Sequence, residues 1–128
     1  MYQTYKDRAE FYLVYIREAH PTDGWRIQGN VEVADPDTQK ERQDVAQVCS
    51  LKLDLSMPVL VDDTADSVNL AYAAWPERLY VIGKDGTIAY AGGMGPMLFK
   101  PEECEAFLVE HLADPKHCKS EASSAEKK

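Results

Sequence analysis

The chain has 128 residues, 45% of them hydrophobic, which fits one globular domain with a single core. Its 22 acidic and 14 basic residues give a formal net charge of −8, which disfavours binding to nucleic acids and to anionic membranes. No apolar run reaches the roughly 20 residues of a transmembrane helix. The three cysteines are far apart and form no C-x-x-C pair, so we expect a cytoplasmic protein without a disulfide framework or a metal site.

The first strong signal in the chain is the apolar run at residues 11–16. Its β-branched and aromatic side chains predict a short strand that is buried on both faces. Residues 1–8 are compatible with the last turn of a helix. Because an α/β domain normally begins with a strand that such a helix connects to the next, we expect a further strand upstream of Met1.

A long loop at residues 17–36 follows this strand and carries several charged side chains. Thr38 and Glu41 then form an S/T-x-x-E capping box, which predicts a helix from Thr38 to about Leu51. Residues 58–62 predict a strand parallel to the first one, and residues 66–73 predict a further helix. The side chains expected to be buried are Val45, Val48 and Cys49 in the first of these helices and Val68, Leu70, Ala71 and Tyr72 in the second.

The last third of the chain predicts a hairpin and a helix. Residues 78–82 and 87–91 are two strands joined by a turn at 83–86, which contains two glycines. Pro101 and the acidic residues after it predict the start of the final helix. Its inner face should carry Cys104, Phe107, Leu108, His111 and Leu112. We expect the folded domain to span residues 1–114 and to be followed by a disordered polar tail at 115–128.

This order of elements predicts a thioredoxin-like α/β fold. Two crossover units, a hairpin and a closing helix give a mixed sheet of about four strands flanked by helices, without the first β-α segment. Pro76 directly precedes the hairpin, where thioredoxin-like proteins have a cis-proline. On local grounds alone, a trans-proline that ends the preceding helix is an equal alternative.

Three segments carry a resemblance to a known family: residues 15–25, 76–82 and 86–96. In this order and spacing they are similar to the iodothyronine deiodinase family, and the similarity extends over residues 2–112. The resemblance implies a thioredoxin-like enzyme that removes iodide reductively from an iodophenol ring. It also implies a selenocysteine or cysteine nucleophile after the first strand. Cys49, Cys104 and Cys118 do not lie at that position, and we expect them to be buried or incidental thiols.

The first segment supplies candidates for catalysis. Reductive dehalogenation requires a proton donor, and the resemblance assigns this role to His20 because the pKa of an imidazole lies near neutrality. Glu18 could orient His20, raise its pKa or take part in a proton relay. The alternative is that both are solvated loop residues. Tyr15 matches the motif tyrosine of the family and is a candidate for substrate binding, or else a core aromatic residue.

The second segment supplies candidates for binding. Arg78 could hold an anionic group of a substrate, or it could form a surface salt bridge with Glu77 or Asp62. Trp75 could wall an aromatic pocket or pack in the core. The vertebrate enzymes have a second functional histidine shortly before the helix that begins at Thr38, whereas residues 34–38 contain none and include an acidic residue instead. This difference argues against thyroid hormone as the substrate.

Three functions remain open from the sequence. The first is a deiodinase-like oxidoreductase with a small aromatic substrate, a thiol reductant or thioredoxin-like donor, and no bound cofactor. The second is a redox-inactive thioredoxin-like binding module, and the third is a peroxiredoxin-like or general thiol-disulfide enzyme. The unpaired edge of the strand at 11–16 further predicts that the chain either forms a homodimer or is a fragment of a longer protein.

Overall fold

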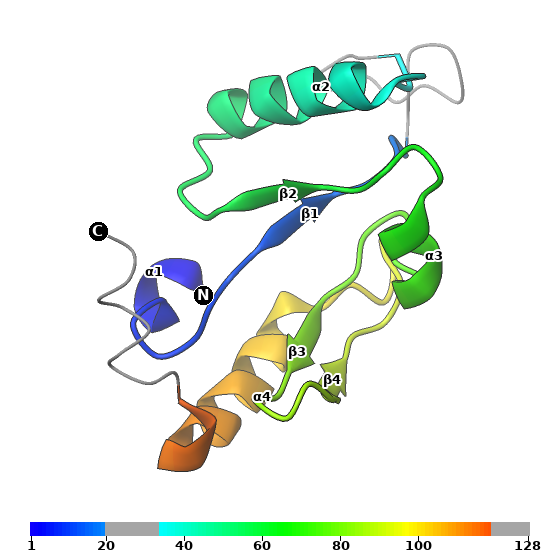
Figure 1. Cartoon of the computed structure of the whole chain (residues 1–128). Helices are drawn as coiled ribbons and strands as arrows, with labels where there is room; N and C mark the ends of the chain where they lie inside the picture. The colour runs from blue at the N-terminus through cyan, green and yellow to red at the C-terminus, as the bar shows by residue number, and fades with distance from the viewer. Residues whose placement is uncertain (20–33, 119–128) are drawn as a thin grey trace. The chain divides into compact units, whose positions relative to one another are not determined.

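The computed structural model describes residues 1–19 and 34–118, and the chain has a mixed α/β fold, as predicted (Figure 1). Two compact units are present. One consists of Tyr12–Pro76, and the other combines Met1–Phe11 with Glu77–Lys128. Among the described residues, no helix has the length and apolar character needed to cross a membrane.

The unit Tyr12–Pro76 contains a parallel pair of strands and two helices. β1 (Leu13–Tyr15) pairs with β2 (Val59–Val61), and Val14 lies opposite Leu60 in the register. α2 (Gln39–Lys52) packs against β2, and α3 (Ser67–Tyr72) follows β2 in the chain. Thr38 caps α2 through the predicted capping box with Glu41. The parallel pairing and the start of α2 are therefore confirmed.

Burial in this unit differs from the prediction. Val14 exposes 37% of its surface, so β1 is not buried on both faces, and Leu70 of α3 exposes 73%. Val48 and Val68 are exposed as well, whereas the residues buried in α2 and α3 are Arg42, Ala46 and Asn69. The physical reason is that polar contacts of Arg42 and Asn69 orient these two helices, so that hydrophobic periodicity alone misplaces their inner faces.

The second unit contains a short helix, a hairpin and the final helix. α1 (Tyr2–Tyr5) begins the chain, and β3 (Tyr80–Ile82) pairs antiparallel with β4 (Ile88–Ala91) as predicted. α4 (Pro101–Ala113) begins at the predicted proline. It buries Cys104, Leu108 and Leu112, and its Phe107 ring stacks on Tyr90 of β4 at 5.3 Å between ring centroids.

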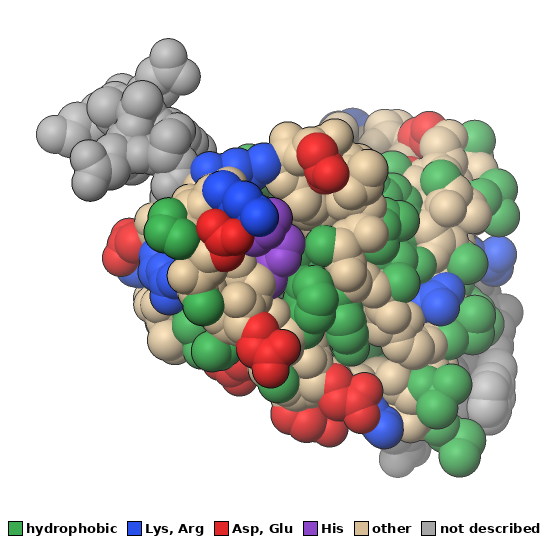
Figure 2. Space-filling view, turned by 90° about the horizontal axis from the view of Figure 1, so that it is seen from below, with side chains coloured by type: hydrophobic (Ala, Val, Ile, Leu, Met, Phe, Trp, Pro, Cys, Tyr) green, Lys and Arg blue, Asp and Glu red, His purple; other side chains and the backbone are tan. Residues whose placement is uncertain are grey.

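The chain beyond α4 begins with a structured segment rather than a disordered tail. A 3₁₀ helix, η1 (Pro115–His117), places the ring of His117 on the ring of His111, with 3.9 Å between centroids. Arg8 donates hydrogen bonds to the carbonyl of Leu112 and to the Cys118 sulfur, which holds this segment against α4. On the face of the molecule shown in Figure 2, a patch of histidine surface lies next to acidic and basic side chains.

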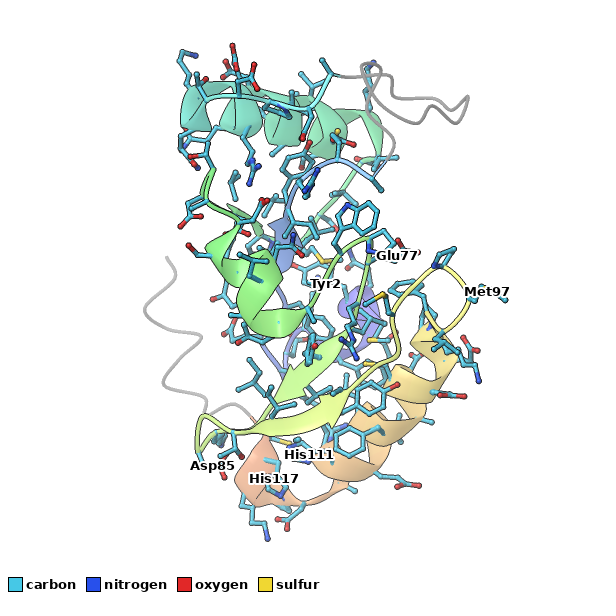
Figure 3. All side chains as sticks on the ribbon, turned by 90° about the vertical axis from the view of Figure 1, so that its right-hand side faces the viewer. Tyr2, Glu77, Asp85, Met97, His111 and His117 are labelled. Carbon is cyan, nitrogen blue, oxygen red and sulfur yellow. The ribbon has the colours of Figure 1, made fainter. Side chains whose placement is uncertain are left out.

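The sheets are smaller than expected. The described strands form two separate pairs, β1 with β2 and β3 with β4, so a single sheet of about four strands stays a prediction. Within the second unit, Asp85 in the hairpin turn lies at the same end as His117, and Met97 lies at the opposite end in the loop before α4 (Figure 3).

Candidate functional site

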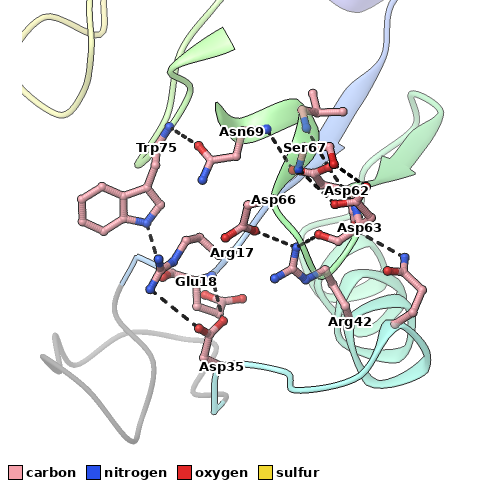
Figure 4. Close-up of polar contacts among 12 residues, drawn as sticks. Arg17, Glu18, Asp35, Arg42, Asp62, Asp63, Asp66, Ser67, Asn69 and Trp75 are labelled. Carbon is pink, nitrogen blue, oxygen red and sulfur yellow. Dashed lines mark hydrogen bonds and ion pairs between the residues drawn. The ribbon is translucent and has the colours of Figure 1, made fainter. Parts of the chain in front are cut away.

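Polar side chains gather where the parallel strands β1 and β2 end (Figure 4). Tyr15 is the last residue of β1, and Glu18 follows three positions later. Asp62 comes directly after β2. In α/β folds, the carboxyl ends of parallel strands are the usual position for a site, because the loops that follow them converge there. All these residues belong to the unit Tyr12–Pro76.

Tyr15 and Glu18 form the central pair of this cluster. The phenol of Tyr15 donates a hydrogen bond to the carboxylate of Glu18. Burial, followed by the hydrogen bond and the negative charge of Glu18, raises the pKa of the Tyr15 phenol well above its ordinary value. Tyr15 therefore remains protonated at neutral pH. It is a hydrogen-bond donor to a carboxylate rather than only a core aromatic residue.

Asp35 joins the two sides of the loop that follows β1. One carboxylate oxygen accepts a hydrogen bond from the Glu18 backbone N–H at 3.4 Å, and the other lies 3.9 Å from the Arg17 guanidinium. This acidic residue lies in the region that lacks the second family histidine. The Arg17 guanidinium partly offsets the negative charge of Asp35. Both side chains are partly exposed, so the ion pair itself adds little stability.

Trp75 reaches the same cluster from the loop after α3. Its indole N–H donates a hydrogen bond to the Glu18 carbonyl at 3.4 Å, and its backbone N–H donates to the Asn69 side-chain oxygen at 2.9 Å. Trp75 exposes 41% of its surface, so it is not a core residue. The Trp75-Pro76 peptide bond is cis, which confirms the position predicted for the cis-proline.

Arg42 of α2 anchors the loop between β2 and α3. Its guanidinium donates to the Asp63 carbonyl at 2.5 Å and to the Asp66 carboxylate at 2.9 Å, while its Nε is buried without a partner. The buried Asp62 carboxylate accepts hydrogen bonds from the N–H groups of Val68 and Asn69. The roles of Arg42 and Asn69 were not predicted from the sequence. The sequence does contain one feature that could have indicated a site here. Three aspartates follow the strand β2, at positions 62, 63 and 66, and such an acidic group favours a cationic partner.

Arg78 lies in the other unit, after Pro76. Its Nε donates a hydrogen bond to the carbonyl of Gly92 at 2.7 Å, and its guanidinium carbon lies 5.7 Å from the centre of the Tyr80 ring. These contacts fix the guanidinium against its own hairpin. Gly92 belongs to the glycine-containing loop that follows β4, so backbone from this loop lies next to the Arg78 side chain.

The remaining candidates are the histidine and the thiols. His20 lies outside the described residues. Burial raises the pKa of the Cys49 thiol, and the charge of Glu18 raises it further; burial likewise raises the pKa of Cys104. Both thiols are therefore protonated at neutral pH and are weak nucleophiles. In the part of the chain that the structure describes, no three His, Cys, Asp or Glu residues are placed to hold a metal ion.

Comparison with known proteins gives a consistent result. The family model described as iodothyronine deiodinase matches residues 1–112. The chain is 40% identical to the type II iodothyronine deiodinase of Petromyzon marinus over 102 residues, which are 78% of this chain and 35% of that protein. It is 37% identical to the type I enzyme of Xenopus laevis over 95 residues, 74% of this chain and 37% of that protein. With the human type II enzyme it shares 35% identity over 113 residues, 82% and 40% of the two chains. The chain thus spans less than half the length of these relatives.

Proposed function

This chain belongs to the iodothyronine deiodinase family, and from this we propose that the protein is a thiol-dependent oxidoreductase that removes iodide from an iodophenol-type substrate. The observation that supports the proposal most directly is the Tyr15–Glu18 hydrogen bond at the end of β1. This bond supports the proposal because it holds the carboxylate of Glu18, a candidate proton-transfer group, at the end of the strand that carries the first family motif. Trp75 lies next to the same pair.

The reaction that we propose is a two-electron reduction of a carbon–iodine bond. A thiolate of the reductant, which is a soft sulfur nucleophile, takes the iodine, and the ring carbon receives a proton in its place. Two thiols of the reductant are oxidised to a disulfide, and iodide leaves together with one proton. The step needs a group that donates a proton to the ring or to the phenol oxygen of the substrate.

In this proposal Glu18 and His20 take part in proton transfer, and Tyr15 lies beside them as a hydrogen-bond donor and a candidate contact for the substrate. His20 donates the proton, because an imidazole side chain can both take up and release a proton near neutral pH. Glu18 accepts from Tyr15 and connects that phenol to the donor. Tyr15 acts as a hydrogen-bond donor that keeps the carboxylate in place.

Two further residues serve substrate binding in the proposal. The exposed Trp75 ring offers an aromatic surface for the iodinated ring, since offset stacking of aromatic rings is favourable. Arg78 offers a positive charge to a carboxylate or phenolate of the substrate. Because residues 34–38 lack the second histidine, we expect an iodophenol-type compound rather than thyroid hormone itself.

The deiodinase proposal has more support than the alternatives from the sequence. None of the relatives named above is a peroxiredoxin, and none is described as a binding module. The thioredoxin-like arrangement with one four-stranded sheet is part of the proposal, as are the thiol reductant and the absence of a bound cofactor. The cytoplasmic location and the homodimer stay predictions.

The test is iodide release from an iodinated phenol by the full protein in the presence of dithiothreitol. The proposal expects thiol-dependent release that falls by about 100-fold or more in Glu18→Gln, the range for loss of a positioned proton-transfer group. Glu110→Gln, in an exposed position of α4, is the matched control and should retain full activity. Thiol-dependent peroxide consumption without iodide release would contradict the proposal and favour the peroxiredoxin-like alternative.

A further inference from the structure

Asn69 is the one uncharged polar residue among the buried residues of the described chain. It exposes 7% of its surface and lies in the middle of the short helix α3. The sequence predicts that the apolar residues of α3 are buried, yet two of them, Val68 and Leu70, are exposed. Asparagine is also a modest helix former, so neither hydrophobicity nor helix propensity explains its burial.

The hydrogen bonds of Asn69 show what this burial achieves. Its backbone N–H donates to the buried Asp62 carboxylate at 2.9 Å, which ties α3 to the end of β2. Its carbonyl accepts from the N–H of Ala74 at 3.0 Å, and its side-chain oxygen accepts from the N–H of Trp75 at 2.9 Å. One residue thus connects the end of β2 to the two residues that lead into Pro76.

We propose that Asn69 is a positioning residue that holds Trp75 in place beside Glu18. The Asn69 side chain fixes the backbone of Trp75, and the indole of Trp75 reaches the Glu18 carbonyl at 3.4 Å (Figure 4). Asn69 itself acts only through Trp75. The consequence for turnover rests on the function proposed above, whereas the effect on the position of Trp75 does not.

The chemistry of the site requires an acceptor at this position. The backbone N–H of Trp75 donates to Asn69 in a part-buried position, where an unpaired donor is unfavourable. A leucine at position 69 has a similar size but no acceptor, so the turn at residues 73–75 would have to move in order to expose this N–H to water. An aspartate keeps a carboxyl oxygen at the same position, whether or not it is ionised.

The test uses Trp75 as its own reporter in the full chain. The sequence contains two tryptophans, so Trp25→Phe leaves Trp75 as the single indole fluorophore. In this background we expect Asn69→Leu to shift the Trp75 emission to the red and to raise its acrylamide quenching constant. Asn69→Asp should keep both values near those of the parent. Far-UV circular dichroism verifies that each variant is folded.

Kinetic measurements distinguish a role of Asn69 in positioning Trp75 from a general loss of folded structure. Asn69→Leu should raise the KM for the iodinated phenol by about 5- to 10-fold, the effect of losing one hydrogen bond that orders the binding surface, with a smaller change in kcat. Asn69→Asp should keep KM near the value of the parent protein. In a Trp75→Ala background Asn69→Leu should add no further change, because the two residues act in series.

The outcomes distinguish the two proposals. If folded Asn69→Leu leaves the emission and quenching of Trp75 unchanged, or if Asn69→Asp changes them as much as Asn69→Leu, the positioning role is wrong. If the fluorescence responds as expected but the parent protein releases no iodide, the positioning role stands and the deiodinase proposal fails.

Discussion

The phenol of Tyr15 donates a hydrogen bond to the carboxylate of Glu18, three residues further along the chain. Tyr15 ends a β-strand and Glu18 lies in the loop that follows, so the strand delivers the donor and the loop delivers the acceptor. A phenol that binds a carboxylate in a half-buried position is held in its neutral form. This pair connects the end of the strand to the chemistry proposed for the site, and the first two predictions depend on it.

Tyr15→Phe should reduce thiol-dependent iodide release by about 10- to 100-fold, because it removes one hydrogen bond to a group that takes part in proton transfer. The measurement is iodide release over a range of pH. Tyr12→Phe is the matched control, since Tyr12 lies next to β1 with an exposed side chain. Equal activity of the two variants would contradict a role for the Tyr15 phenol.

The free energy of unfolding should decrease as the pH rises above about 10, the ordinary pKa of tyrosine. The sign follows from the raised pKa of Tyr15: the folded chain holds this proton more tightly than the unfolded chain, so the stabilisation is complete below the unfolded pKa and is lost as the pH approaches the folded pKa. Urea unfolding at a series of alkaline pH values measures this loss. In Tyr15→Phe the decrease should be smaller, and an identical decrease in both proteins would refute the assignment.

Arg42→Met should destabilise the protein by about 2–4 kcal/mol, because it removes one partner of a buried ion pair and leaves the carboxylate of Asp66 without its cation. Lys40→Met provides the matched comparison on the same helix, since the ion pair between Lys40 and Asp44 is exposed and its loss should change stability little. Urea unfolding of both variants gives the difference. Similar effects would mean that the burial of Arg42 has no energetic importance.

Thr38→Ala should lower the free energy of unfolding by about 1 kcal/mol, the usual effect of losing an N-cap. The Thr38 hydroxyl accepts a hydrogen bond from the Glu41 N–H at 3.2 Å, and the Glu41 carboxylate accepts from the Thr38 N–H at 3.1 Å. Thr64→Ala, in an exposed position between β2 and α3, should have almost no effect. Chemical denaturation monitored by circular dichroism compares the two, and a smaller loss in Thr38→Ala than in Thr64→Ala would rule out the cap as a stabilising feature.

Features that depend on neighbouring residues were predicted well. The start of α2 follows from the chemistry of Thr38 and Glu41, the hairpin from the turn at residues 83–86, and the start of α4 from Pro101. In each case the responsible groups lie within a few residues of one another, so the information is local. The parallel pairing of β1 and β2 was also predicted, because a strand–helix–strand connection permits few other arrangements.

The family was likewise accessible from the sequence, because a motif keeps the order and spacing of its side chains. The matches over residues 1–112 agree with that interpretation. The partner of Tyr15 was not predicted. Two residues three positions apart face each other only if the chain turns at the end of the strand, and that turn is a property of the folded loop.

Burial was decided by tertiary structure alone. Arg42 and Asn69 are polar and would be expected on the surface, yet they lie inside, while Leu70 is largely exposed. Their burial is possible because residues outside their own helices supply the missing partners: Asp63 and Asp66 for Arg42, and Asp62 and Trp75 for Asn69. Hydrophobic periodicity counts only side chains on one helix, whereas the free energy of burying a polar group depends on hydrogen bonds that exist only after the helix, the strand end and the following loop have come together.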